Sequence, residues 1–246
     1  MSPPNAAQTA RERARAELTR EIRQEARRQL AKAGANGLSL RAVARELGMV
    51  SSALYRYYPS RDDLLTALII DAYDAIGATA EAAIAATAGA PVRERWAAAC
   101  RAIRAWAVAN PHEYALIYGS PVPGYRAPEA TIGPASRVPL AFSSLLAGAG
   151  PDPGGAAGAP GLSGPLAAQA AALVAALSTS LPAAPALAAA EVGPVPADML
   201  VRAVIAWTQL FGMISFELFG QFVGSFDPAD AVFDYAVDRM AAFVGL

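Results

Sequence analysis

The sequence contains few residues that carry redox, metal or acid–base chemistry. Cys100 is the only cysteine and His112 the only histidine among 246 residues. A single cysteine forms neither a disulfide framework nor a cluster of thiolate metal ligands, and a single histidine excludes a His-rich metal site. Neither residue has a plausible catalytic partner, so no Ser/His/Asp or Cys/His set is expected. We therefore predict no metal, no cofactor and no enzymatic activity.

Segments that resemble a signal peptide or a membrane span are also lacking. Residues 1–9 have no apolar core of the kind found in signal peptides. The longest Ala/Leu run lies between Pro165 and Pro182 and falls short of the ~20 strongly apolar residues of a membrane span. We expect a cytoplasmic protein with no membrane partner. The alternation of apolar and polar residues that is typical of strands is absent as well, which favours an all-α fold.

Charge is scarce and unevenly distributed. Charged residues make up 17% of the chain and hydrophobic residues 54%, which is enough to bury a sizeable core. The formal net charge is -1, a value that by itself disfavours a nucleic-acid partner. Residues 1–66, however, hold 12 basic and 7 acidic residues, whereas residues 67–246 hold 8 basic and 14 acidic ones. The basic N-terminal part therefore remains a candidate for binding nucleic acid.

Apolar residues recur at helical spacing along most of the chain. Predicted helices cover residues 9–33, 40–47, 51–58, 60–87, 91–109, 110–118, 166–181, 199–222 and 228–244. A Pro- and Gly-rich stretch at 120–139 predicts a loop or a broken helix. Residues 148–165 and 183–197 are of low complexity, and we expect flexible loops there because such sequences bury too little surface to offset their ordering entropy.

Two short helices around Gly48 form the most informative unit. In the second of them, which starts at Ser51, only Leu54 and Tyr58 are expected in the core. Residues 51–53 are small enough to allow close approach, and residues 55–57 offer hydroxyl and guanidinium donors. In a helix-turn-helix the second helix lies in the major groove of DNA, with side chains on base edges and phosphates. Eight basic residues between Arg11 and Lys32 would add salt-sensitive attraction to phosphates.

The pattern alone leaves alternatives open. Helix-turn-helix geometry also occurs in enzymes, and acidic residues such as Glu17 and Glu21 interleave with the arginines of the first helix, as on an ordinary solvated face. An all-α carrier of an apolar ligand, or an enzyme without DNA binding, is therefore a second interpretation. A third is a structural interaction module, which would not account for Tyr55 to Tyr57.

The residues around this unit resemble the TetR family of transcriptional regulators. The similarity lies in LSLRAVARELG at 38–48 and LYRYYPSRDDLL at 54–65. It implies DNA contacts by Ser39, Arg41, Ser51, Ser52, Ala53, Tyr55, Tyr57 and Arg61. Arg61 stands where the family usually has a phosphate-binding Lys, Val50 where a polar N-cap is common, and Ser52 where Gly is frequent. These departures leave the operator sequence unspecified.

The second part of the chain is similar to TetR regulators whose C-terminal domain carries a Trp-His-Gly motif. The similarity rests on residues 110–121, Trp207, Phe211-Gly212 and residues 216–218, with Phe211 in the place of the motif's His. It implies an all-helical domain that binds a ligand and dimerises. The expected organisation is a flexible arm at 1–9, a helix-turn-helix DNA-binding domain at 10–60, and a ligand-binding and dimerisation domain at 61–246.

Aromatic residues in this second part suggest a pocket for a small apolar or aromatic ligand. The candidates are Trp96, Trp106, Tyr114, Tyr118, Phe142, Trp207, Phe211 and Glu217. The alternative is that these aromatics are simply core, and Glu217 could face either a cavity or a dimer interface.

A heptad-like spacing in the penultimate helix and the apolar face of the last helix predict a homodimer. Its expected contacts are Leu200, Val204, Ile214, Leu218, Phe233 and Met240. A two-fold dimer would bind a pseudo-palindromic operator in double-stranded DNA. A ligand would then shift helix 60–87 and change the spacing of the two recognition helices.

Overall fold

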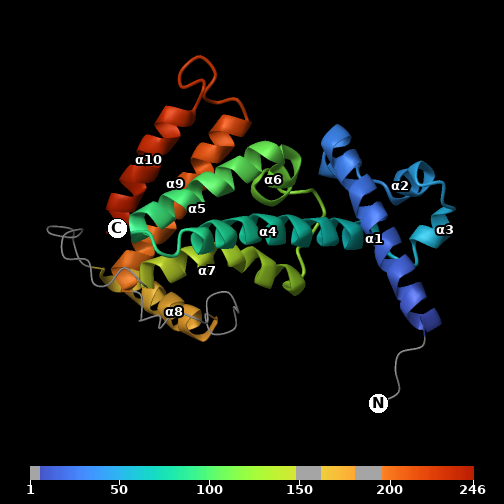
Figure 1. Cartoon of the computed structure of the whole chain (residues 1–246), viewed down its shortest axis with the longest axis horizontal. Helices are drawn as coiled ribbons and strands as arrows, with labels where there is room; N and C mark the ends of the chain where they lie inside the picture. Colours follow the sequence, from blue (N-terminus) through green and yellow to red (C-terminus); the bar gives the residue numbers. More distant parts are fainter. Residues whose placement is uncertain (1–5, 148–161, 181–195) are drawn as a thin grey trace. The chain divides into compact units, whose positions relative to one another are not determined.

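The computed structural model describes residues 6–147, 162–180 and 196–246, and all regular elements in these ranges are helices (Figure 1). The all-α prediction is therefore confirmed for the described part of the chain. Most of the two predicted flexible loops, 148–165 and 183–197, lies outside the described residues, as do residues 1–5 of the predicted arm. The α-helices are α1 (Ala6–Ala33), α2 (Leu40–Glu46), α3 (Ser51–Leu54), α4 (Arg61–Ala86), α5 (Val92–Ala109), α6 (Pro111–Tyr118), α7 (Ile132–Ala147), α8 (Gly164–Ser180), α9 (Ala197–Leu218) and α10 (Asp230–Val244), and the short 3-10 turns are η1 (Ala35–Gly37) and η2 (Glu129–Thr131).

The chain divides into two compact units. The first comprises residues 1–73 and 112–132, and the second comprises residues 74–111 and 133–246. This division differs from the boundary expected after residue 60. The reason is that the first turns of α4 bury Leu64, Leu65 and Leu68 in the core of the first unit, so this unit needs more than α1 to α3 to be complete. Helix α4 contributes residues to both units.

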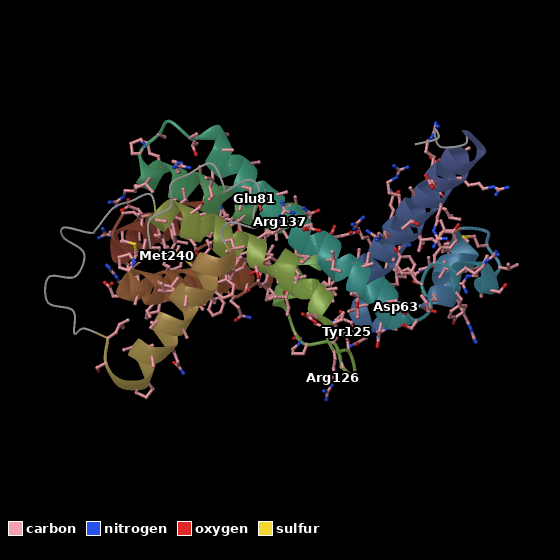
Figure 2. All side chains as sticks on the ribbon, turned by 90° about the horizontal axis from the view of Figure 1, so that it is seen from below. Asp63, Glu81, Tyr125, Arg126, Arg137 and Met240 are labelled. Carbon is pink, nitrogen blue, oxygen red and sulfur yellow. The ribbon has the colours of Figure 1, made fainter. Side chains whose placement is uncertain are left out.

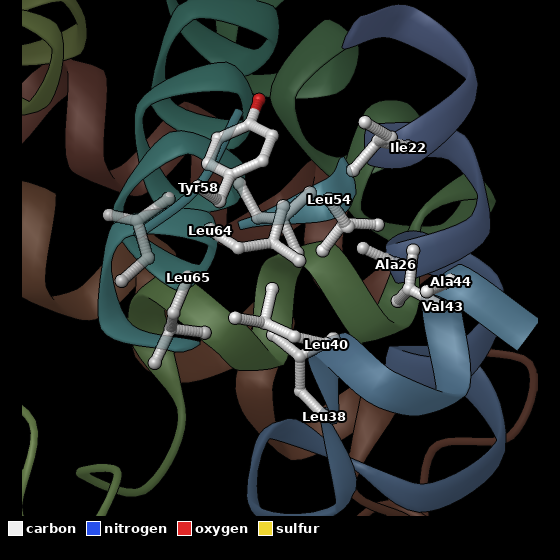
Figure 3. Packing of buried hydrophobic residues seen from close by; sticks show 12 residues of the cluster. Ile22, Ala26, Leu38, Leu40, Val43, Ala44, Leu54, Tyr58, Leu64 and Leu65 are labelled. Atoms are coloured by element: carbon white, nitrogen blue, oxygen red, sulfur yellow. The ribbon is translucent and has the colours of Figure 1, made fainter. Parts of the chain in front are cut away.

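The core of the first unit is a cluster of apolar side chains from four helices (Figure 3). Ile22 and Ala26 of α1 pack with Val43 of α2, Leu54 of α3 and Leu64 of α4, and all five have zero exposed area. Burying such side chains is worth roughly 1.5–3 kcal/mol for each large one. Because α2 and α3 each supply so few buried residues, their position depends on α1 and α4.

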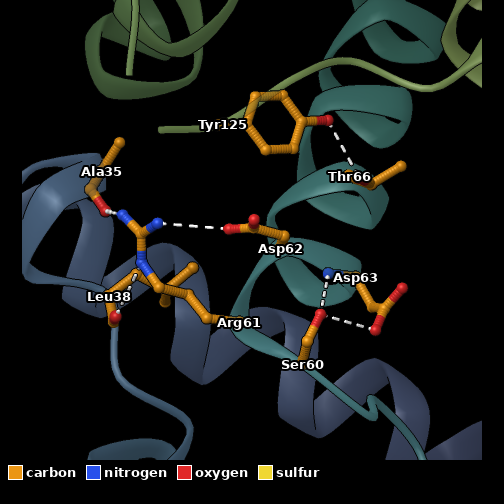
Figure 4. Close-up of polar contacts among 8 residues, drawn as sticks. All are labelled: Ala35, Leu38, Ser60, Arg61, Asp62, Asp63, Thr66 and Tyr125. Carbon is orange, nitrogen blue, oxygen red and sulfur yellow. Dashed lines mark hydrogen bonds and ion pairs between the residues drawn. The ribbon is translucent and has the colours of Figure 1, made fainter. Parts of the chain in front are cut away.

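Helix boundaries in the first unit differ from expectation at two places. Helix α1 begins at Ala6, so Thr9 lies inside the helix and is not its N-cap. Helix α3 ends at Leu54, and residues 55–57 form a turn that continues its backbone hydrogen bonds, with the Tyr57 amide donating to the Leu54 carbonyl. Ser60 caps the start of α4, because its hydroxyl accepts from the Asp63 amide at 3.1 Å and donates to the Asp63 carboxylate at 2.7 Å (Figure 4).

Helices α5, α8 and α10 all pack against α9 in the second unit. Arginines on α5 also pair with aspartates on α10 in reverse order along the chain. The pairs are Arg93 with Asp238 at 2.6 Å, Arg101 with Asp234 at 2.8 Å and Arg104 with Asp230 at 2.8 Å. The reversed order shows that the two helices run antiparallel. The aspartates are mostly exposed, so these pairs fix register more than they add stability.

The prediction of a loop or broken helix at 120–139 is correct for 120–131 but wrong for 132–139, which belong to helix α7. This helix runs from Ile132 to Ala147 with Pro139 inside it. A proline in a helix interior costs about 3 kcal/mol or more because it lacks a donor and crowds the preceding turn. Here the helix is held by its neighbours, since Val138 and Phe142 are buried and Arg137 bonds to two carboxylates of α4. Tertiary packing thus keeps this segment helical despite Pro139.

Helix α9 is the one helix in the described ranges that is long and apolar enough to cross a membrane, by length and composition alone. One of its faces is core, because Leu210 and Ile214 are buried within the second unit. Its opposite face carries exposed apolar side chains, including Ile205 and Phe216.

Candidate DNA-binding surface and ligand cavity

Helix α2 begins with a side-chain cap. Ser39 is its N-cap, and its hydroxyl accepts a hydrogen bond from the Ala42 amide at 3.4 Å. The Ser39 amide in turn donates to the Gln29 side chain at 3.5 Å, which ties the start of α2 to α1. Arg41 lies in the first turn of α2 and is exposed. The exposed Arg41 guanidinium therefore lies near the N-terminus of α2, where anions are favoured.

Helix α3 and the turn after it expose two of their five predicted contact residues and leave the other three half-buried. Ser52 and Tyr55 are exposed, Ser51 and Ala53 are half-buried, and Leu54 between them is fully buried. Val50 occupies the N-cap position without a side-chain cap and is 71% exposed. The small side chains leave the backbone of α3 accessible, and the exposed Tyr55 hydroxyl is a donor at its C-terminal end. This is the arrangement of a recognition helix in a helix-turn-helix.

Tyr57 is half-buried and has a partner that the sequence did not indicate. The Arg15 guanidinium of α1 lies 5.3 Å from the centre of the Tyr57 ring, within cation–π range. The pair connects α1 to the turn after α3 across 42 positions of sequence. No periodic signal relates residues so far apart, which is why Arg15 was missed.

Arg61 has a different role from the phosphate contact implied by the family resemblance. Its Nη2 donates to the Ala35 carbonyl at 2.6 Å and its Nε to the Leu38 carbonyl at 3.3 Å, while its Nη1 faces Asp62 at 3.3 Å (Figure 4). The guanidinium is thus engaged with the segment between α1 and α2. It positions this segment, and the phosphate contact implied by the resemblance stays a prediction.

An ion-pair network joins α1, α4 and α6 inside the first unit. Asp71 of α4 accepts from Arg23 at 2.7 Å and from Arg27 at 2.8 Å. Arg23 also donates to the Tyr58 hydroxyl at 2.8 Å, and Arg27 lies 3.4 Å from Glu113 of α6. Burial alone lowers the pKa of Arg23, but the Tyr58 hydroxyl and the Asp71 charge outweigh it and raise this pKa above its ordinary value. The network holds α6 against α1 and α4.

A cavity of about 140 Å³ lies in the second unit. It is lined by Trp96, Pro139, Phe142, Ser143, Leu173, Leu200, Ala203, Val204, Trp207 and Leu210. Three of the predicted pocket aromatics, Trp96, Phe142 and Trp207, are therefore brought together. The Trp96 and Phe142 ring centres lie 4.7 Å apart, so these two side chains form one continuous wall.

The other predicted pocket residues lie elsewhere. Trp106 and Phe211 do not line the cavity, although the Phe211 ring packs against Trp207 at 5.6 Å. Tyr114 and Tyr118 belong to the first unit, where their rings lie 5.3 Å apart and burial raises the pKa of Tyr118. Helical spacing could not separate these tyrosines from the aromatics of the second unit.

Glu217 is bound by an arginine and does not line the cavity. The Arg104 guanidinium donates to both of its carboxylate oxygens at 2.7 Å. These hydrogen bonds raise the pKa of Arg104 further above its ordinary value. A bidentate ion pair of this kind requires a specific geometry, and it joins α5 to α9. Of the two positions we considered for Glu217, the cavity is excluded and the dimer interface stays a prediction.

The predicted dimer contacts are mostly buried inside the second unit. Leu200, Ile214, Phe233 and Met240 are at most 4% exposed, so they offer no side-chain surface to another chain and are corrected to core residues. Leu218 is half-buried, and Val204 is 41% exposed at the rim of the cavity. The heptad-like spacing identified the inward face of α9. Exposed residues of α9 and its C-cap include Ile205, Thr208, Gly212, Phe216 and Phe219, and those of α10 include Ala231, Tyr235, Arg239 and Phe243; we call these residues the α9–α10 face.

Arg137 of α7 binds α4 within the second unit. It donates to both oxygens of Glu81, at 2.6 and 2.9 Å, and to the Asp74 carboxylate at 2.9 Å (Figure 2). These hydrogen bonds, the one to Glu81 first, raise the pKa of Arg137 above its ordinary value. Gly77 makes the approach possible, because a Cβ there would stand 2.6 Å from the Arg137 Cβ. Arg137 lies two residues before Pro139, which lines the cavity.

The described residues contain no group of three or more His, Cys, Asp or Glu side chains able to hold a metal ion. Cys100 is fully buried, and burial raises the pKa of its thiol far above the ordinary value. A thiol kept protonated in this way is unreactive. The ordinary hydrophobic role expected for Cys100 fits this position.

Comparison with known families identifies the chain. Residues 22–68 match the family described as "Bacterial regulatory proteins, tetR family", and residues 96–240 match the "Tetracyclin repressor-like, C-terminal domain". The chain belongs to the TetR family. Both matches fall where the two resemblances were predicted, and the C-terminal match covers the cavity, α9 and most of α10.

Relatives of this TetR protein support the assignment. It is 51% identical over 135 residues to the HTH-type transcriptional regulators Mb1846 of Mycobacterium bovis and Rv1816 of Mycobacterium tuberculosis. That match covers 54% of this chain, and the chain spans 58% of the length of these curated relatives. The crystal structure of the protein SCO4313 is 37% identical, with a TM-score of 0.66 over 93% of this chain and 97% of the other. A protein from Rhodococcus sp. RHA1, 24% identical with a TM-score of 0.61 over 93% and 96% of the two chains, shares the fold.

Proposed function

We propose that this TetR protein is a ligand-responsive transcriptional repressor that binds a pseudo-palindromic operator in double-stranded DNA as a homodimer. The observation that carries the proposal is the outward face of α3. There, the hydroxyl-bearing side chains of Ser52 and Tyr55 are exposed and that of Ser51 is half-buried. Leu54 is buried in the core and holds the helix in place. Such a helix, preceded by a short helix and a glycine turn, fits the major groove of DNA.

Positive charge surrounds this face. Arg41 of α2 and Arg56 after α3 are exposed, as are Arg11, Arg13 and Arg20 of α1. Exposed arginines of this kind bind phosphate oxygens and position a protein on the duplex without reading its sequence. The charge therefore supplies the general affinity, and the α3 side chains supply the sequence preference.

The α9–α10 face supports the homodimer. Ile205, Phe216 and Phe219 of α9 and Tyr235 and Phe243 of α10 are between 43% and 67% exposed. Apolar side chains gathered on neighbouring helices in this way mark an interaction surface. A second copy of the chain is the occupant that a self-complementary two-fold contact requires. Such a dimer presents two α3 helices to half-sites about one helical turn apart.

Helix α7 provides a path from ligand to DNA. Its Pro139, Phe142 and Ser143 line the cavity, and its Arg137 is paired with Asp74 and Glu81 of α4. The first turns of α4 belong to the core of the DNA-reading unit. A ligand that prefers one position of α7 therefore changes the preferred position of α4, and it releases DNA only through this difference in affinity.

The decisive experiment is a gel shift with DNA taken from upstream of the protein's own gene. The wild-type protein should bind, and the affinity should fall steeply between low and physiological salt, by about 10³-fold or more if six phosphates are contacted. Arg41→Ala and Tyr55→Ala should each weaken specific binding by about 1–3 kcal/mol, the loss of one phosphate or base contact.

Arg101→Ala is the matched control for Arg41→Ala. It removes the same charge from an exposed arginine in the second unit and should leave DNA affinity unchanged. If Arg41→Ala and Tyr55→Ala bind as the wild type does, α3 is not the recognition helix and the proposal is wrong.

A further inference from the structure

Helix α3 is too short to fix its own orientation. It is a single turn, Ser51–Leu54, and Leu54 is the only one of its residues that is buried. One buried side chain attaches the helix to the core but does not prevent it from rotating about its axis. A recognition helix must present a defined face to the base edges, so such a rotation would displace the side chains that read the sequence. Contacts outside α3 must therefore set its orientation.

The two tyrosines that follow α3 supply these contacts, and both meet arginines of α1. Tyr58 is buried, and its hydroxyl accepts a hydrogen bond from the Arg23 Nε at 2.8 Å. Arg23 is itself anchored, because its Nη1 donates to Asp71 of α4 at 2.7 Å. Tyr57 is half-buried and packs against the core of the first unit. The Arg15 guanidinium lies over the Tyr57 ring, 5.3 Å from its centre.

Both tyrosines are connected to α3 by backbone hydrogen bonds. Their amides donate to the Leu54 carbonyl, at 2.9 Å from Tyr57 and 3.1 Å from Tyr58. Arg15 and Arg23 approach them from points on α1 that are roughly 12 Å apart along the helix axis. Two contacts made from separate points resist a rotation that a single contact permits. The contact of Arg15 is made to the Tyr57 ring, so it leaves the Tyr57 hydroxyl able to bind DNA.

From these contacts we infer that Arg15 is a positioning residue that determines sequence specificity, because by holding Tyr57 it fixes the orientation of α3 on the bases. The inference rests on the proposed operator binding and adds a specificity determinant that lies outside the helix-turn-helix. The competing interpretation is that Arg15, which is exposed like Arg11 and Arg13, binds a phosphate. A phosphate contact strengthens binding to every DNA sequence, whereas an oriented recognition helix strengthens binding only where the bases match.

Two DNA duplexes separate these interpretations when the full-length protein is titrated and binding is followed by fluorescence anisotropy. One duplex is taken from upstream of the protein's own gene, and the other is a scrambled duplex of the same length and base composition. The ratio of the two affinities is the sequence preference. We expect Arg15→Ala to lower this preference about two- to fivefold, the factor that an exposed cation–π pair provides.

The salt dependence of binding gives a second readout. Loss of a phosphate contact would leave the sequence preference unchanged and would reduce the slope of log affinity against log salt by about 0.9. We expect Arg15→Ala to keep the wild-type slope on the scrambled duplex. Arg13→Ala is the matched control, because Arg13 is an exposed arginine of the same helix. It should weaken binding to both duplexes by the same factor and so keep the wild-type preference.

Variants of Tyr57 test whether the effect of Arg15 depends on the aromatic ring. Tyr57→Phe keeps the ring, whereas Tyr57→Leu removes it. Arg15→Ala should lower the preference in the Tyr57→Phe background as it does in the wild type. In the Tyr57→Leu background it should have no further effect, because the partner of Arg15 is already missing. Each comparison is made within one background, so a loss of stability or of the hydroxyl affects both of its members alike.

The inference is overturned if Arg15→Ala keeps the wild-type preference or reduces the salt slope as a phosphate contact does. It is also overturned if Arg13→Ala lowers the preference as much, or if Arg15→Ala has the same effect in both Tyr57 backgrounds. A wild-type protein that binds the two duplexes equally well refutes the proposed operator binding, and the inference with it. A wild-type preference without coupling between Arg15 and Tyr57 refutes the inference alone.

Discussion

The Nη2 of Arg61 donates a 2.6 Å hydrogen bond to the carbonyl oxygen of Ala35, so the first residue of α4 holds the turn that precedes α2. A second hydrogen bond, from the Arg61 Nε to the Leu38 carbonyl, connects Arg61 to the residues just before α2. One planar guanidinium thus donates to two backbone carbonyls of the segment between α1 and α2. A side chain that the family resemblance placed on DNA therefore sets the position of the helix-turn-helix.

Replacing Arg61 by Ala should lower the free energy of unfolding by about 1–2 kcal/mol, because two backbone acceptors lose a charged donor. Urea denaturation followed by circular dichroism measures the change. Arg45→Ala is the control, since Arg45 is 75% exposed and only 3.7 Å from its neighbour Glu46; its effect should stay below about 0.5 kcal/mol. Equal stability of the two variants would contradict the positioning role.

Asp71 accepts from two arginines of α1, so Asp71→Asn should cost about 1–3 kcal/mol of stability in the first unit. The carboxylate is only 19% exposed, and its loss leaves Arg23 and Arg27 without their shared counter-charge. Amide hydrogen exchange should show faster opening of α1. Glu46→Gln, at an exposed carboxylate, is the control, and an unchanged exchange rate in Asp71→Asn would exclude the network as a stabilising element.

Glu217→Gln should destabilise the second unit by about 2 kcal/mol, because the exchange removes a charge-assisted two-point pair with a partly buried arginine. Thermal unfolding measures the loss. Asp234→Asn breaks the exposed pair with Arg101 and should change stability by less than about 0.5 kcal/mol.

Gly77→Ala should destabilise the protein by about 1–3 kcal/mol through overpacking. The new methyl group would meet the Arg137 Cβ at 2.6 Å, and this atom cannot move without shifting α7. Gly133→Ala is the matched control, because a Cβ at that position of α7 meets nothing within 4 Å; it should be neutral or slightly stabilising. Loss of the ligand response in Gly77→Ala with DNA binding retained would support the path through α7.

Phe216→Asp should convert the dimer to a monomer, because it places a charge in the centre of the proposed apolar contact. Sedimentation equilibrium at micromolar concentration would then report a mass near 25.3 kDa. Val108→Asp, at a 49% exposed position of α5, is the control and should remain dimeric. A wild-type protein that is already monomeric under these conditions would refute the dimer altogether.

Local signals predicted much of the first unit. The helix predicted at 40–47 is α2, with Leu40, Val43 and Ala44 buried, and the helix predicted from residue 60 is α4. These features depend on residues within one or two turns of each other. The role of Arg61 was not predictable, because its partners lie 23 and 26 positions away and are backbone atoms that any residue could supply.

The second unit was harder to predict because its helices are apolar on more than one side. On α9 the spacing of Leu200 and Ile214 marked a seam, but periodicity does not say whether a neighbouring helix or a second chain covers it. The structure places these residues in the core and leaves Ile205 and Phe216 exposed. Helix α7 was missed because Pro139 is a local breaker, and only its packing with α4 keeps it helical.

The sequence by itself determined that the chain is helical, that its N-terminal quarter carries a helix-turn-helix, and that its family is TetR. Each depends on spacing along a single helix or on a contiguous motif. The tertiary structure alone decided which aromatics share a cavity, which face of α9 is exposed, and that Arg61 and Glu217 are bound within the protein. These three features depend on contacts between residues that are far apart in the chain. A local sequence pattern contains no information on the free energy of such contacts.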